Sequence, residues 1–223
     1  MKRLLLVRHA TTAATRRAAF PVTTGRAAHA ACAALDDAGA ATATALGATL
    51  PRSDRCWTSH ARRTVETARC LGLEPDARMA ELAEADFGRW AGATLGEVHR
   101  RDPEGLAAWL ADPGSTPHAG EPFAEVRRRA AAVLAAAHGL GGTTLAISHG
   151  GLIKAAVLEV LGLPDAALWR IDCAPASVSE LQPTRDGWTV VAMDWTPEPP
   201  AWKAAAHART VAADAAGRGG AAR

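Results

Sequence analysis

Two short apolar runs, each followed by a histidine, limit the folds that are open to this chain. Residues 4–7 precede Arg8 and His9, and residues 143–148 precede His149 and two glycines. Both runs are too short for a buried helix and are typical of strands covered on both faces. In a sheet of parallel strands the ligand crevice lies beyond the carboxyl ends. Arg8, His9 and His149 therefore form a candidate site if the two strands are neighbours.

The remaining periodicities predict further helices and strands around this pair. Apolar spacing predicts helices at residues 40–50, at 123–138 and after His149, and Ser59 is placed to cap a helix that runs to residue 71. Strands are predicted at residues 55–58, and as a hairpin at residues 176–181 and 188–193. Residues 12–30 show no clear period, which predicts an irregular loop with a short helical turn.

The length of the chain suits one α/β domain with a full core, which we place at residues 1–196 of the 223. Two short helices between residues 94 and 110 predict a small helical cap at approximately residues 89–119. Residues 197–223 are rich in proline and then in alanine, arginine and glycine. They offer little apolar area to offset ordering entropy, which predicts a loosely held tail.

Composition argues against several classes of function. The net charge of +2 gives no electrostatic reason to expect a nucleic-acid partner. Four single cysteines, with no C-x-x-C spacing, indicate neither a zinc site nor a redox pair. The first apolar stretch is shorter than a signal-peptide core of about 7–15 residues, and no segment is long enough to span a membrane. We therefore expect a cytoplasmic protein without membrane contact.

Five motifs in order carry a resemblance to a known family. Arg8-His9-Ala10-Thr11 resembles the R-H-G-x-[ST] signature of the histidine phosphatase superfamily, also called phosphoglycerate mutase-like. The similarity continues through residues 58–68, residues 84–88, Gly120-Glu121 with Arg129, and residues 148–151, and covers roughly residues 2–193. Within the family, residues 84–92 are similar to the phosphatase branch that contains α-ribazole phosphatases and sugar-phosphate phosphatases.

The resemblance implies a fold and a set of roles. The expected fold is an α/β three-layer α/β/α sandwich with a mainly parallel central sheet and a small helical cap. His9 matches the nucleophile that accepts the phosphoryl group, and Glu84 matches the acid that protonates the leaving group. Arg8 and Arg63 match the phosphate-binding arginines, and His149 matches the second histidine, which is catalytic and also binds phosphate.

The chemistry of these side chains agrees with such roles. A phosphomonoester carries up to two negative charges, and two guanidiniums offer planar forks for its oxygens. A neutral imidazole is a competent nucleophile near neutral pH when a backbone carbonyl holds its other nitrogen. Glu84 can donate a proton only where burial or the incoming phosphate favours its neutral form. Because Arg8, Arg63 and His149 are expected to supply positive charge, no metal and no other cofactor is expected.

Alternatives are open at several of these positions. The resemblance favours Arg63 over its neighbour Arg62, because the family's arginine lies four residues after the serine that Ser59 represents and four before Thr67. Glu81 and Asp86 compete with Glu84 for the acidic role. Thr15 and Arg16 are the candidate substrate-binding residues, although Arg16, Arg17 and Arg26 also fit a solvated face. Of the remaining histidines, which are expected at the surface, His118 is the one placed to line the crevice from the cap.

Three departures from the family pattern bear on the activity. Ala10 replaces the usual glycine, which is harmless if its φ is negative. Thr15 stands where mutases commonly have asparagine, and the stretch from Glu84 to Gly120 looks shorter than the region with which mutases hold a bisphosphorylated cofactor. These differences leave phosphoryl chemistry intact and weaken a mutase interpretation.

Three functions are therefore compared. The favoured one is a phosphatase that hydrolyses a small phosphomonoester through a phosphohistidine on His9, with α-ribazole phosphate or a sugar phosphate as the candidate substrate. The alternatives are a phosphoglycerate mutase-type phosphotransferase and a non-catalytic phosphate-binding module. The expected partner is a small phosphorylated metabolite. A homodimer through an edge strand is compatible with the sequence, but no residue pattern requires it.

Overall fold

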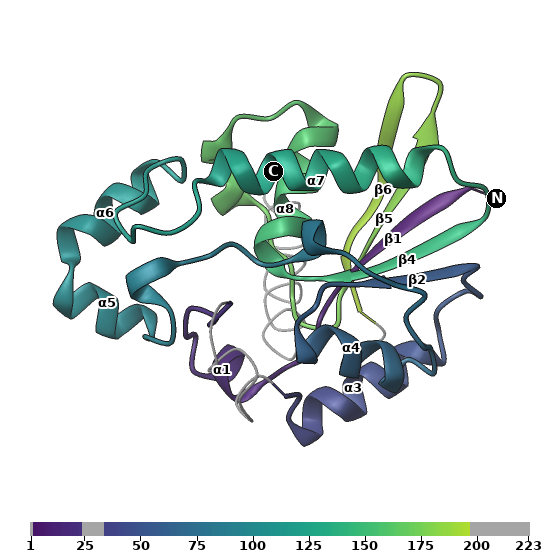
Figure 1. Ribbon diagram of the computed structural model, residues 1–223, viewed down its shortest axis with the longest axis horizontal. Helices are drawn as coiled ribbons and strands as arrows, with labels where there is room; N and C mark the ends of the chain where they lie inside the picture. The colour runs from purple at the N-terminus through teal and green to yellow at the C-terminus, as the bar shows by residue number, and fades with distance from the viewer. Residues whose placement is uncertain (1, 24–33, 197–223) are drawn as a thin grey trace, which may run out of the picture.

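A six-stranded sheet forms the centre of the molecule (Figure 1). The computed structural model describes residues 2–23 and 34–196. The strands lie in the order β3-β2-β4-β1-β5-β6. Their bounds are β1 Arg3–Arg8, β2 Arg55–Thr58, β3 Ala77–Arg78, β4 Thr143–Ser148, β5 Val178–Thr184 and β6 Gly187–Trp195. β1 to β4 are mutually parallel where they pair, whereas β5 and β6 join antiparallel at one side. The predicted α/β fold with a mainly parallel sheet is confirmed.

Helices cover both faces of the sheet, as the side chains of β1 show. Leu4 and Leu6 pack on one face in a cluster with residues of α7 (Phe123–His138) and α8 (Gly150–Leu161). Leu5 and Val7 point to the other face, where α3 (Asp37–Gly47) and α4 (Arg62–Cys70) lie. Burial on both faces explains why this strand is apolar without alternation, since each buried Leu or Val contributes roughly 1.5–3 kcal/mol.

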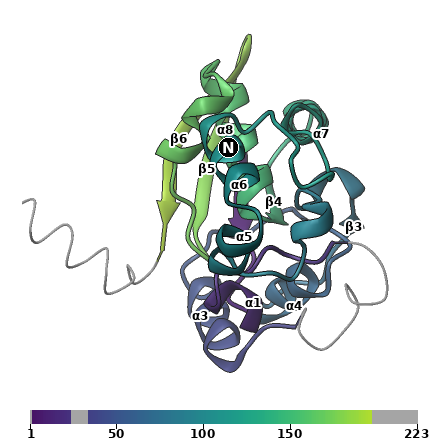
Figure 2. The same cartoon turned by 90° about the vertical axis from the view of Figure 1, so that its left-hand side faces the viewer.

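The predicted cap region contains short helices that lie to one side of the main body in Figure 1 and face the viewer in Figure 2. These are η3 Gly88–Trp90, α5 Leu95–Arg101 and α6 Pro103–Ala111. Thr94 and Glu97 form a capping box at α5, and Asp102 caps α6, where Pro103 takes the first position. Trp90, Val98 and Leu106 of this segment form a separate apolar cluster together with Phe20.

Several element bounds differ from the predictions. α3 begins at Asp37 instead of residue 40, because Asp36 Oδ1 accepts a hydrogen bond from the Gly39 amide at 2.7 Å and caps the helix earlier. β3 has only two residues and was not predicted, and residues 165–170 form the 3-10 segment η4. α1, Ala13–Arg16, is the predicted helical turn, capped by Thr12. Residues 24–33 and the predicted tail, 197–223, lie outside the described residues.

Within residues 2–23 and 34–196, no helix combines the length and the apolar character that a membrane span requires. The three cysteines of this part of the chain are free thiols. Burial raises the pKa of Cys56 to about 12, so it remains an uncharged thiol near neutral pH.

Candidate active site

The register of the two central strands brings the two histidines together. Arg8 of β1 pairs with Ser148 of β4, and the His9 amide donates to the Ser148 carbonyl at 2.9 Å. The next residue of each strand is a histidine, and the two imidazole centroids lie 5.1 Å apart with an interplanar angle of 63°. The prediction that His9 and His149 share one edge of the sheet is therefore confirmed.

The His9 ring has a defined tautomer. Its Nδ1 lies 2.8 Å from the Ala10 carbonyl, which can only accept, so Nδ1 carries the proton and Nε2 has a free lone pair. His9 is only 4% exposed. Burial, with the nearby charges of Arg63 and Arg8, holds the pKa of His9 well below its usual value of 6.5. The ring is therefore neutral at pH 7.

The backbone that holds His9 is itself anchored to α4. The Ala10 amide donates to Thr67 Oγ1 at 3.1 Å, and this hydroxyl donates to the Arg63 carbonyl at 2.7 Å. Ala10 is fully buried and is not among the described residues with positive φ, so the alanine replaces glycine here without backbone strain. Sequence reasoning assigned no role to Thr67; its spacing of four residues from Arg63 was the available signal.

His149 has the opposite tautomer from His9. Its Nδ1 accepts from Arg63 Nη2 at 3.0 Å, so the proton is on Nε2, which donates to Ser59 Oγ at 2.9 Å. Complete burial and the Arg63 charge hold the pKa of His149 well below its usual value. The expectation that His149 supplies positive charge is therefore wrong for this structure, because the buried ring beside a guanidinium is neutral.

Ser59 has a different role from the predicted helix cap. α4 begins at Arg62 with Ala61 as its N-cap and no side-chain capping bond. Ser59 Oγ instead accepts from His149 and from the Ala61 amide and lies 2.9 Å from Thr64 Oγ1. The hydroxyl is drawn away from the helix end because the buried His149 Nε2–H would otherwise have no acceptor.

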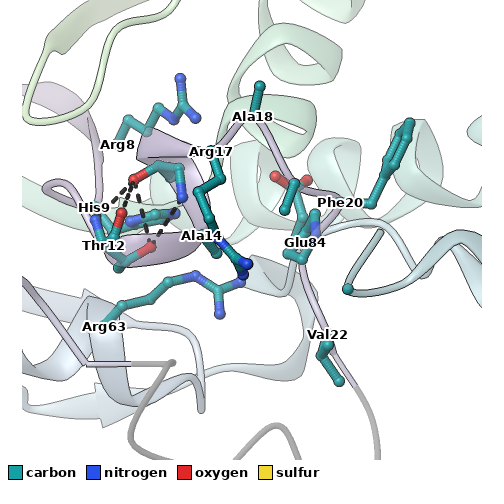
Figure 3. Close-up of a pocket in the computed structure, with 14 residues that line it drawn as sticks. Arg8, His9, Thr12, Ala14, Arg17, Ala18, Phe20, Val22, Arg63 and Glu84 are labelled. Carbon is teal, nitrogen blue, oxygen red and sulfur yellow. Dashed lines mark hydrogen bonds between the residues drawn. The ribbon is translucent and has the colours of Figure 1, made fainter. Parts of the chain in front are cut away.

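The two neighbouring arginines of α4 lie in different environments. Arg63 is 6% exposed and lines a cavity of about 180 Å³ together with Arg8, His9 and Glu84 (Figure 3). Arg62 is on the surface, where it pairs with Glu66 at 2.6 Å. The structure thus brings Arg63 and not Arg62 to the histidines.

Arg8 closes another side of the same cavity. Its Nη1 donates to the Cys173 carbonyl, and its Nε is buried without a hydrogen-bond partner in the described part of the chain. Figure 3 shows its guanidinium on the other side of His9 from Arg63. A buried donor without a partner is costly, which marks Arg8 as a group suited to an anionic ligand.

Glu84 reaches the cavity at the N-terminus of α8. One carboxylate oxygen accepts from the Ala85 amide at 3.0 Å and the other from the Gly151 amide at 3.3 Å. A Cβ on Gly151 would lie 2.4 Å from Glu84 Oε1, so only glycine lets the carboxylate approach this closely. The competing acids lie elsewhere: Asp86 accepts from the Gly88 amide, and Glu81 is absent from the cavity lining.

A buried ion pair holds the segment that carries Glu84. Arg129 of α7 makes two hydrogen bonds to Glu121, at 2.8 and 2.7 Å, and its Nη1 donates to the carbonyls of Glu81 and Ala83 at 2.9 and 2.7 Å. Both charged side chains are largely buried. Arg129 therefore joins three segments and fixes the backbone next to Glu84.

The two predicted substrate-binding residues lie in different places. Thr15 lines the cavity, but its hydroxyl is engaged with Thr12 in the cap of α1. Arg16 does not line it; it pairs with Asp36 at 2.6 Å and holds the pKa of that carboxyl well below its usual range. Arg17 lines the cavity instead, and Figure 3 shows its side chain reaching into it. Arg26 lies outside the described residues.

His118 is buried, although the sequence suggested a surface residue. It is 2% exposed, packs against the rings of Phe87 and Trp90 at centroid distances of 5.7 and 5.3 Å, and its Nδ1 accepts from the Gly120 amide. Burial lowers its pKa. The described residues contain no group of His, Cys, Asp and Glu side chains that could hold a metal ion.

Comparisons with known proteins agree with this geometry. A segment of 127 residues, 55% of this chain, is 35% identical to the bifunctional protein Rv2228c of Mycobacterium tuberculosis and covers 34% of it. Another match, 31% identical over 123 residues, covers 52% of this chain and 60% of the adenosylcobalamin/alpha-ribazole phosphatase of Salmonella typhimurium. The chain thus spans less than two thirds of the length of these curated relatives.

The fold and the family are shared over a longer range. The solved structure of the open reading frame Rv3214 product from Mycobacterium tuberculosis superposes with a TM-score of 0.73 at 27% identity, over 88% of this chain and 99% of that one. The model of the histidine phosphatase superfamily, branch 1, matches residues 4–196, which include both histidines, Arg8, Arg63 and Glu84. This chain belongs to branch 1 of the histidine phosphatase superfamily.

Proposed function

We propose that this protein is a phosphatase that hydrolyses a small phosphomonoester through a phosphohistidine on His9. The observation that carries the proposal is the state of His9. Its Nδ1–H is held by the Ala10 carbonyl, its Nε2 lone pair is free, and its lowered pKa keeps the ring neutral. The same cavity is lined by Arg8, Arg63 and the carboxylate of Glu84, which are the groups that phosphoryl transfer from an alcohol requires.

In the first step, Nε2 of His9 attacks phosphorus and the bond from phosphorus to the alcohol oxygen breaks. Arg8 and Arg63 bind the equatorial oxygens, on which negative charge spreads in the transition state. The leaving oxygen takes a proton from Glu84, which lines the same cavity. His149 accepts a hydrogen bond from Arg63 and so positions that guanidinium.

In the second step, a water molecule attacks the phosphohistidine. Glu84, now a carboxylate, takes a proton from this water, and the bond between phosphorus and Nε2 breaks. Inorganic phosphate leaves, His9 returns to its neutral tautomer, and Glu84 again holds the proton that it began with. No metal or other cofactor takes part, because the two arginines provide the positive charge.

We also propose which phosphomonoester the enzyme hydrolyses. The similarity to a relative named adenosylcobalamin/alpha-ribazole phosphatase supports α-ribazole phosphate as a substrate, and a sugar phosphate is the second candidate. A homodimer through an edge strand and a cytoplasmic location stay predictions.

The test is phosphate release from α-ribazole phosphate, sugar phosphates, nucleotides and 3-phosphoglycerate, with and without bisphosphoglycerate. His9→Ala should abolish release, and His60→Ala, which alters an exposed histidine, should leave it unchanged. Wild-type protein quenched at alkaline pH should carry a phosphoryl group on His9 by mass spectrometry. Interconversion of phosphoglycerates without phosphate release would instead indicate a mutase, and silence on every substrate would favour a binding module.

A further inference from the structure

A second cavity, of about 220 Å³, adjoins the first one on the side of the cap. Arg8 and Glu84 line both cavities, so they stand at the boundary between them. The walls of the second cavity include Phe87, Trp109, Lys154 and Trp169. Because Glu84 lies at the boundary, an alcohol whose oxygen contacts Glu84 can extend directly into this second space.

Lys154 is the unusual residue of this cavity. It lies on α8, is half-buried, and forms no hydrogen bond with another described residue. Burial lowers its pKa, although the charges of Asp172 and Glu84 oppose the shift. A half-buried cation is normally in direct contact with an acid. Among the described residues, Asp172 and Glu84 act on Lys154 only through their charges, without a hydrogen bond or ion pair to it.

Among the residues that line the cavity, the charges leave a positive balance; Asp172, whose charge also acts on Lys154, is not one of them. Arg8 is a second cation, and Glu84 is the acid that faces it. Glu121 is neutralised by its two hydrogen bonds from Arg129. His118 is kept neutral by its lowered pKa. An anionic group near Lys154 would therefore meet a favourable potential.

The remaining walls are aromatic and suit an apolar or planar body. Trp109 and Trp169 lie edge to face with ring centroids 4.7 Å apart, and Phe87 packs against Trp109 at 5.9 Å. Trp169 is 40% exposed, so part of this aromatic surface is open to a ligand. Such walls bury the surface of a ligand ring, and a single polar group then fixes the orientation of the ligand.

We propose that the second cavity binds the alcohol part of the substrate, and that Lys154 gives the enzyme a preference for alcohols with an apolar or planar body and an anionic group. This inference rests on the proposed phosphatase function and narrows its substrate class. A neutral sugar or nucleoside would leave the half-buried Lys154 ammonium without a direct contact to an anion, so such substrates are the poorer ones.

The test compares 4-carboxyphenyl phosphate with 4-methylphenyl phosphate, which differ in charge at the far end of the same ring. Wild-type protein should hydrolyse the carboxylate substrate with the higher kcat/KM. Lys154→Met should lower this preference about 10-fold, as expected for a partly buried ion pair. Lys154→Arg should retain most of it. Lys2→Met removes the same charge from an exposed position before β1 that lines neither cavity, and it should change nothing.

Binding gives a second readout that does not depend on turnover. In a His9→Ala background, calorimetry should show that Lys154→Met weakens binding of the carboxylate substrate and leaves that of the methyl substrate unchanged. If Lys154→Met does not fold, Lys154→Gln takes its place in both measurements.

The outcomes separate this inference from the proposed function. Absence of hydrolysis of every phosphomonoester would overturn the proposed function itself. Hydrolysis with the same substrate preference in wild type and Lys154→Met would overturn only the inference, as would hydrolysis of other substrates but neither aryl phosphate. A loss of preference in Arg17→Met and not in Lys154→Met would place the alcohol in the first cavity, and would equally overturn the inference.

Discussion

The hydroxyl of Ser59 lies 2.9 Å from His149 Nε2 and accepts a hydrogen bond from its N–H, which fixes the tautomer whose Nδ1 accepts from Arg63. Ser59, which follows β2, thereby positions the Arg63 guanidinium of α4 through His149, which follows β4. The three segments are separated along the chain and meet only because β2 and β4 are paired. The position of Arg63 thus depends on a chain of two hydrogen bonds.

Ser59→Ala should lower kcat and destabilise the protein. The His149 Nε2–H would lose its acceptor, and a buried donor without a partner costs about 1–3 kcal/mol. We expect a drop in kcat of about 10-fold because Arg63 loses its fixed partner. Steady-state kinetics and urea unfolding measure the two effects. Ser115→Ala, which alters an exposed turn, is the control; equal effects of both variants would contradict the role of Ser59.

Arg63→Lys and Arg62→Lys should differ strongly in activity. Lysine keeps the charge but loses the planar fork, so Arg63→Lys should reduce kcat/KM about 100-fold. Arg62 pairs with Glu66 at the surface, so its replacement should change kcat/KM less than twofold. Phosphate release from one substrate measures both. A larger loss in Arg62→Lys would refute the placement of Arg63 in the phosphate site.

Gly151→Ala should impair catalysis through Glu84. The added Cβ would lie 2.4 Å from Glu84 Oε1, so the carboxylate must move away from its hydrogen bond to the helix. We expect kcat to fall about 10-fold or more, as for a displaced proton donor. Gly96→Ala is the matched control, since a Cβ there meets nothing within 4 Å and alanine favours helix α5. Retained activity in Gly151→Ala would exclude this placement of Glu84.

Arg129→Met should reduce both stability and activity. It leaves the largely buried Glu121 without its partner, which costs about 3 kcal/mol, and releases the carbonyls of Glu81 and Ala83. The midpoint temperature of thermal unfolding and kcat should both fall, because the freed segment carries Glu84. Arg128→Met, whose arginine is exposed on the next position of α7, should have little effect on either. A loss of stability with unchanged kcat would limit Arg129 to a structural role.

The free energy of unfolding should fall as the pH drops below about 6.5. His9, His149 and His118 have lowered pKa values when folded, so the unfolded chain binds protons in this range that the folded chain does not. Each can contribute up to about 1.4 kcal/mol per pH unit, and the loss continues down to the folded pKa values. Urea unfolding at pH 7.5, 6.5 and 5.5 measures this change in the free energy of unfolding. His9→Ala should flatten the slope and His60→Ala should not; a constant stability would contradict the neutral histidines.

Local patterns in the sequence determined much of this molecule. The apolar runs before His9 and His149 are the predicted strands, because a strand buried on both faces must be apolar at every position, and the two strands are parallel neighbours. α7 spans the predicted residues 123–138, and β2 spans the predicted residues 55–58. The resemblance to the family also separated Arg63 from Arg62, through the spacing of the family's arginine from the serine that Ser59 represents.

Only the tertiary structure decided which groups interact with these residues. Arg16 is held by Asp36, twenty positions away, which leaves Arg17 to line the cavity. Ser59 serves His149 instead of its own helix. The neutral state of His149 could not be predicted from the sequence either, because burial and a guanidinium from another segment set its pKa. Hydrogen bonds and electrostatic shifts depend on distances in space, whereas patterns along the chain report periodicity and local preference.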